Sequence, residues 1–148
     1  MVLVQTPRLL TMLRWQHQTQ ATPLPESLVT GNSAIDHEHA LLLDQLDNLR
    51  AAQDLSTRDE AVGEALNNIS QLLLSHFAHE EAFMRNSPMP EGAFADHLDA
   101  HLAIIEEMCN LQTLMMKAPV MVAEVLATIE TWIVAHIRDF DLQIKRYD

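Results

Sequence analysis

Apolar residues recur at steps of three and four along four stretches of this 148-residue chain, which is the spacing of one face of an α-helix. Each row also places a histidine where the pattern calls for an apolar side chain, and the third row places two. The rows are Ile35, His39, Leu42, Leu46 and Leu49; Ile69, Leu73, His76, Glu80 and Phe83; Phe94, His97, His101, Ile104, Met108, Leu111 and Met115; and Val122, Leu126, Ile129, Ile133, His136 and Phe140. Because ionisable side chains are rarely buried without partners, a fold that buries these rows must give the histidines something to bind.

The connections between the rows are short and contain helix breakers. Pro88 and Pro90 interrupt the pattern after the second row, and Pro119 suits the first turn of a fourth helix. A hydrophobic content of 48% with only 3 glycines also favours helices over strands. The sequence therefore predicts an all-α fold, an up-down-up-down antiparallel four-helix bundle over residues 32–148. Residues 1–31 lack a sustained helical pattern and are expected to form an N-terminal arm.

The charge and cysteine content exclude several kinds of partner and location. A formal net charge of -12 opposes binding to phosphate backbones and to anionic lipid, and the nine Lys and Arg residues form no run. Cys109 is the only cysteine, so no intrachain disulfide can form. No stretch has the length and apolar character of a membrane span. We expect a soluble cytoplasmic protein without nucleic acid or membrane partners, and the sequence leaves a protein partner or homo-oligomer open.

The spacing of the histidines and carboxylates favours a metal site. His97 and His101 lie about 40° apart around a helix and about 6 Å apart along it, so both rings can reach one ion. His76 and Glu80 share that interval, and Asp141 follows the last histidine of the fourth row by five residues. Five imidazoles and two carboxylates are too many for one ion and suit two. Imidazole with carboxylate suits iron, and ligand type alone leaves zinc, copper and manganese open.

Four motifs, in this order, resemble those of the hemerythrins and specifically the bacterial hemerythrin-like domains. They are Ile35-Asp36-x-x-His39, His76-Phe77-x-x-Glu80-Glu81, His97-x-x-x-His101 and Trp132-Ile133-x-x-His136-Ile137-x-x-x-Asp141, with intervals of 37, 4, 17, 4, 35 and 5 residues between ligand positions. The resemblance runs from about Gly31 to the C-terminus. It implies two oxo- or hydroxo-bridged iron ions, one held by His97, His101 and His136, the other by His39 and His76, with Glu80 and Asp141 bridging. It also implies a dioxygen pocket lined by Phe77, Trp132, Ile133 and Ile137.

The function that the resemblance implies is reversible binding of dioxygen for storage, transport and delivery, or sensing. A histidine-rich site is less anionic than a carboxylate-rich one, which disfavours high-valent iron and favours binding over catalysis. The alternative is a di-iron redox enzyme, such as an oxidase, a peroxidase or a nitric-oxide-handling enzyme, that uses the same site. Ferritin-like oxidases are disfavoured because they place histidine three residues after glutamate, and no Glu-x-x-His occurs in this chain.

Other polar residues have structural interpretations. His17 and His37 are expected at the surface, and His79 at a solvated boundary position beside the predicted ligands. Asp36 and Glu81 either support ligand histidines or cap and charge helices, and the second interpretation is preferred.

Overall fold

The computed structural model describes residues 23–52, 58–117 and 122–147, so most of the predicted arm, residues 1–22, lies outside the described residues. Four long helices make up the described chain: α2 (Ser33–Ala52), α3 (Arg58–Arg85), α4 (Glu91–Lys117) and α5 (Val122–Asp139). Two short 3-10 helices, η1 (Glu26–Leu28) and η2 (Asp141–Tyr147), flank them. The described ranges contain no strand, which confirms the all-α prediction.

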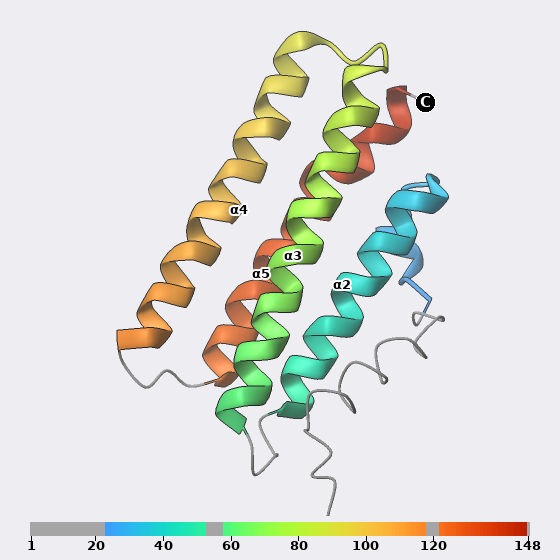
Figure 1. Cartoon of the computed structure of the whole chain (residues 1–148). Helices are drawn as coiled ribbons and strands as arrows, with labels where there is room; N and C mark the ends of the chain where they lie inside the picture. Colours follow the sequence, from blue (N-terminus) through green and yellow to red (C-terminus); the bar gives the residue numbers. More distant parts are fainter. Residues whose placement is uncertain (1–22, 53–57, 118–121, 148) are drawn as a thin grey trace, which may run out of the picture.

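Consecutive long helices run in opposite directions, as Figure 1 shows. Helices α2 and α4 each pack against both α3 and α5, which closes the four helices into a bundle. The predicted up-down-up-down arrangement is therefore confirmed. Helices α2 and α4 begin, and α3 and α5 end, at the same end of the bundle, where η2 also lies (Figure 1).

The start of α2 is fixed by side-chain caps. The Asn32 side-chain oxygen accepts hydrogen bonds from the backbone N–H groups of residues 34 and 35, at 3.1 and 3.2 Å. One turn further on, Asp36 accepts from the backbone N–H (2.8 Å) and the hydroxyl (2.7 Å) of Thr30. Gly31, at φ 91°, makes the turn that allows this return. The interpretation of Asp36 as a capping residue is confirmed.

The buried apolar side chains form two separate clusters. The larger one runs through the bundle and includes Leu42, Leu73 and Ile133. The smaller one, made by Ile35, Met84 and Ile144, lies at the end where α2 begins. Along α2, α3 and the α5–η2 segment, the predicted ligands lie between these two clusters, so the polar layer divides the core.

The described part of the arm contributes to the core. Leu28 of η1 is only 8% exposed and belongs to the larger apolar cluster. The domain boundary at residue 31 stays a prediction. Within the described ranges, no helix combines the length and the apolar character needed to cross a bilayer. The expected cytoplasmic location and the absence of nucleic acid partners also stay predictions.

Candidate metal centre

All seven predicted ligand side chains come together at one level of the bundle. Helix α2 supplies one, α3 and α4 supply two each, α5 supplies one and η2 supplies one. They are between 0% and 6% exposed: His39, His76, Glu80, His97, His101, His136 and Asp141. Such a concentration of buried imidazoles and carboxylates requires compensation, because burying polar groups without partners is costly.

Asp141 reaches this layer because α5 ends just before it. In a continuing α-helix it would lie about 140° around the axis from His136. Instead α5 ends at Asp139, and the chain tightens into η2, with the backbone N–H of Gln143 bonded to the carbonyl of Phe140 at 3.1 Å. The tighter 3-10 winding leaves the Asp141 carboxylate fully buried among the histidines.

The ligand atoms fall into two groups, in each of which all atoms lie within 4.8 Å of one another. One group combines three histidines, His97, His101 and His136, with both carboxylates. The other combines two histidines, His39 and His76, with the same two carboxylates. Glu80 and Asp141 are therefore shared between the two groups.

Each shared carboxylate divides its two oxygens between the groups. Oδ1 of Asp141 lies 3.0 Å from His97 Nε2 and 2.9 Å from His136 Nε2, while Oδ2 lies 2.9 Å from His39 Nε2. Oε2 of Glu80 lies 3.1 Å from Nε2 of the nearest α4 histidine, His101, and Oε1 lies 3.4 Å from His76 Nε2. This division is the arrangement that two carboxylates bridging two cations require.

Several of these atoms are close together without hydrogen bonding. Glu80 Oε1, Asp141 Oδ1 and the Nε2 atoms of His97 and His136 are buried and have no hydrogen-bond partner in the described part of the chain. Ligands held at right angles about 2.1 Å from one ion lie about 3 Å apart, which matches the observed contacts. Since imidazole nitrogen and carboxylate oxygen are also suitable donors, the residues present fit a pair of transition-metal ions.

The buried carboxylates of the layer also need positively charged partners. Burial alone would raise the pKa of the Asp141 carboxyl, but the surrounding imidazoles, first those of His136 and His39, hold it well below its usual range. Burial likewise opposes protonation of His76, yet its contacts with Asp141 and Glu38 raise its pKa to about 10. Without metal, protonated imidazoles thus neutralise the carboxylates; bound cations would take the place of those protons.

Two glutamates outside the ligand set orient histidines. Glu38 accepts a hydrogen bond from His76 Nδ1 at 2.7 Å and contacts the exposed His79, and Glu81 accepts from His101 Nδ1 at 2.9 Å. Such bonds fix which ring nitrogen is free to bind a metal. Of the two interpretations of Glu81, the bond to His101 favours support of a predicted ligand histidine over the preferred helix-charging role, and the sequence analysis missed Glu38. His37 is exposed as predicted, and His17 lies outside the described residues.

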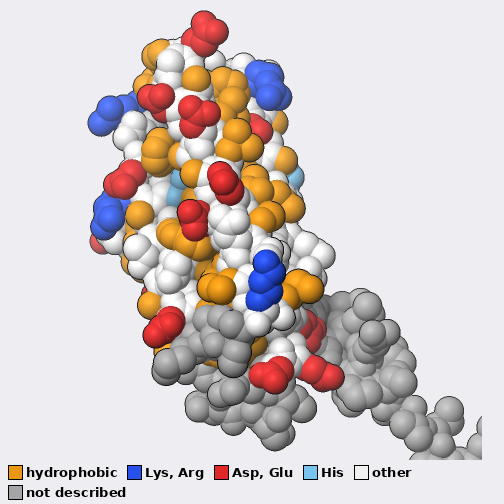
Figure 2. Space-filling model, turned by 90° about the vertical axis from the view of Figure 1, so that its left-hand side faces the viewer, with side chains coloured by type: hydrophobic (Ala, Val, Ile, Leu, Met, Phe, Trp, Pro, Cys, Tyr) orange, Lys and Arg blue, Asp and Glu red, His pale blue; other side chains and the backbone are white. Residues whose placement is uncertain are grey.

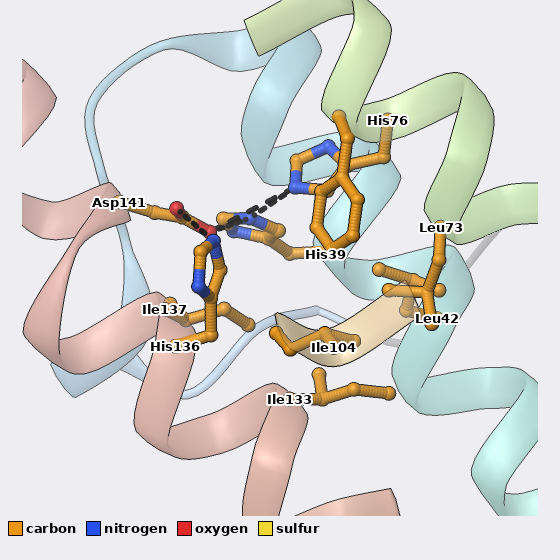
Figure 3. A pocket seen from close by; sticks show the side chains of 10 residues that line it. His39, Leu42, Leu73, His76, Ile104, Ile133, His136, Ile137 and Asp141 are labelled. Carbon is orange, nitrogen blue, oxygen red and sulfur yellow. Dashed lines mark hydrogen bonds and ion pairs between the residues drawn. The ribbon is translucent and has the colours of Figure 1, made fainter. Parts of the chain in front are cut away.

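A small apolar cavity adjoins the layer (Figure 3). It is lined by His39, His76, His136, Asp141, Leu42, Leu73, Phe77, Ile104, Ile133 and Ile137. The free space between them is about the size of one water molecule. Three predicted pocket residues, Phe77, Ile133 and Ile137, therefore line a cavity, whereas Trp132 is half-buried and does not.

The sequence analysis placed the remaining apolar lining residues, Leu42, Leu73 and Ile104, on the buried rows but did not assign them to a pocket. Leu42 lies three positions after His39, and Ile104 lies three positions after His101. Leu73 lies three positions before His76. Their spacing could have identified them, because each lies one helical turn from a buried ligand, on the side toward the larger apolar cluster.

Comparison with known proteins gives two matches. The family described as "Hemerythrin HHE cation binding domain" matches residues 30–146, a range that holds all seven clustered side chains. A curated relative, the "Bacteriohemerythrin" of Stenotrophomonas maltophilia (strain R551-3), is 28% identical over 116 residues, which cover 78% of this chain and 74% of that protein. No solved structure matches the chain.

Proposed function

This chain belongs to the hemerythrin family of HHE cation-binding domains, and from that premise we propose that it holds two iron ions and binds dioxygen reversibly. The role served would be oxygen storage, delivery or sensing. The proposed ligands of one ion are His97, His101 and His136, and those of the other are His39 and His76. Glu80 and Asp141 would bridge them, which is supported by the division of their oxygens between the two groups.

Iron is proposed because the donor set suits it. Imidazole nitrogens with a small number of carboxylates are characteristic of non-haem iron sites with an open position. When bound, two ferrous ions at such a site would supply two electrons to dioxygen. The chain's own part is to hold the ligands rigidly, and the hydrogen bonds from Glu38 and Glu81 to the rings of His76 and His101 contribute to that.

The position of the cavity carries the proposal. The two-histidine group has one nitrogen fewer than the other group. The cavity is lined by both of its histidines, His39 and His76, but by only one histidine of the other group, His136. Its space suits a diatomic molecule and is too small for an organic substrate in this conformation. The apolar side chains around it, among them Phe77, Ile133 and Ile137, would exclude the water and acid that make oxygen binding irreversible.

An anaerobic titration tests the proposal. The protein is loaded with ferrous iron, the iron per chain is counted, and the visible spectrum is recorded as dioxygen is admitted and then removed. We expect two ions per chain and an absorption band that develops with dioxygen and is lost on its removal. Immediate conversion to the ferric state with no reversible band would instead favour the alternative, a di-iron redox enzyme that uses the same residues.

A further inference from the structure

The large exposed apolar side chains of the described residues all lie on two neighbouring helices. Leu74 of α3 is 53% exposed, and on α4 Leu102 is 63%, Leu114 51% and Met116 89% exposed. Figure 2 looks onto the side of the molecule where α4 lies, and hydrophobic side chains gather along it among acidic ones. Leu114 lies on another side of α4, but Leu74, Leu102 and Met116 can share one surface. Apolar surface gathered in this way marks an interaction site more often than isolated exposed leucines do.

Helix α4 carries a second row of mostly apolar residues besides the one that faces the core. We call it the α4 stripe: Leu98, Leu102, Ile105, Cys109, Gln112 and Met116, of which only Gln112 is polar. The steps between its members alternate between four and three, which is the spacing of a coiled-coil seam. The stripe lies about 100° around the helix from the row of His97, His101 and Met108. Leu98, Ile105 and Gln112 are half-buried, and the last two contact the rest of the bundle. Leu102, Cys109 and Met116 are exposed, so these three members of the stripe face away from the described bundle.

Leu74 of α3 extends the stripe. The side chain of Gln112 donates to the Ser70 hydroxyl at 3.0 Å, and His101 Nδ1 donates to Glu81 at 2.9 Å, which fixes the antiparallel register of α3 and α4. Leu74 lies between those two bonds, one turn from Ser70 on the same face of α3. The register therefore sets Leu74 beside the middle of the stripe.

We propose that the α4 stripe is the contact surface for a second copy of this chain, with the two α4 helices antiparallel about a twofold axis near Cys109. Leu102 and Met116 are each seven residues from Cys109. The axis therefore brings Leu102 against Met116 of the partner subunit, so one patch complements itself and the assembly closes as a dimer. Ile105, four residues from Cys109, lies beside the axis, and Leu98 lies at the outer end of the contact.

The charges beside the stripe agree with the antiparallel direction. Lys117 is the only Lys or Arg on α4, and Asp99 lies 18 residues before it, five helical turns away on the same flank. In antiparallel helices equivalent flanks face each other, so Lys117 lies near Asp99 of the partner subunit. The chain's net charge of -12 still opposes association, so the dimer should strengthen with added salt.

The size of the stripe predicts a weak dimer. It is about 27 Å long and one helix wide, which is at the lower end of specific protein interfaces. We therefore expect monomer and dimer to exchange on dilution.

Sedimentation velocity of the full chain, over a range of concentrations in reducing buffer, tests this contact. We expect a reversible monomer–dimer equilibrium. Leu102→Glu or Met116→Glu should raise the dissociation constant by more than about 100-fold, since the twofold axis places each change in the interface twice. Leu114→Glu is the matched control, because Leu114 is a similarly exposed leucine of α4, about 160° around the helix from the stripe.

A thiol cross-link reports on the direction of the helices. A short bismaleimide should join Cys109 to Cys109 of the partner subunit in the unmodified protein and fail to do so in Leu102→Glu. Circular dichroism and iron content, unchanged in both variants, show that the fold is intact. A monomer at every concentration, or a dimer that persists in Leu102→Glu and Met116→Glu, would overturn the proposal and assign the stripe to another occupant.

Discussion

Replacing Glu80 by glutamine tests the proposed bridge most directly. Glu80 is fully buried, and its Oε2 faces the three-histidine group while its Oε1 faces the two-histidine group. Glutamine keeps the size of the side chain, removes its charge and replaces one oxygen with an NH₂ group, which cannot bind a metal. Whichever way the amide lies, one group loses a ligand and the bridge is broken.

The magnitude follows from linkage between binding and folding. At a free iron concentration 100 times the dissociation constant, each bound ion stabilises the native state by about 2.7 kcal/mol. Two ions therefore contribute about 5 kcal/mol, which for a domain of this size is a rise in melting temperature of about 10–20 °C. Glu80→Gln should lose at least half of that rise, and the bound iron should fall from two ions per chain to one or none.

The assay is anaerobic thermal unfolding, followed by circular dichroism with and without ferrous iron, together with an iron count. Glu107→Gln, at an exposed position of α4, is the control and should keep the full shift. If Glu80→Gln retained two ions and the full rise in melting temperature, Glu80 would not be a bridging ligand.

Three smaller changes test the surroundings of the site. Ile137→Ala should speed oxidation of the ferrous protein to the ferric state by opening the cavity wall. Ile129→Ala, an equally buried isoleucine of α5 that does not line the cavity, should not, and equal rates in stopped-flow traces would contradict this. Glu38→Gln should weaken iron binding about 10- to 100-fold in chelator competition, because the His76 ring loses its charged acceptor, and an unchanged affinity would remove that role. Asp36→Asn should cost about 1 kcal/mol, a fall of about 2–4 °C in melting temperature, with iron content unchanged.

The helices and their order could be predicted because each helix buries a row of apolar residues with helical spacing. Prolines also mark the boundary between the second and third rows. The predicted break at Pro88 and Pro90 lies between the end of α3 and the start of α4. The end of α5 was not predicted, because neither glycine nor proline follows Asp139 and the row of the fourth helix continues to Phe140. The change to a 3-10 helix depends on tertiary packing, which the local sequence does not record.

The contacts between helices were harder to predict than the residues of any one row. Spacing along a helix identifies its buried face, so His39, His76, His97 and His136 could be recognised. Glu38 and Glu81 lie beside these faces, and each binds a histidine of a neighbouring helix. Trp132 failed to line the cavity for a related reason, since it lies about 100° around α5 from Ile133.

The polar layer has a structural role as well as a chemical one. It separates the larger apolar cluster from a small one made by Ile35, Met84 and Ile144, and such a small cluster buries little surface on its own. The end of the bundle that includes η2 is therefore held to the rest through the layer, in which Asp141 contacts histidines of α2, α4 and α5. Bound cations would replace imidazole protons there and supply partners to buried atoms that otherwise have none. Metal binding and the packing of this end are thus expected to stabilise each other.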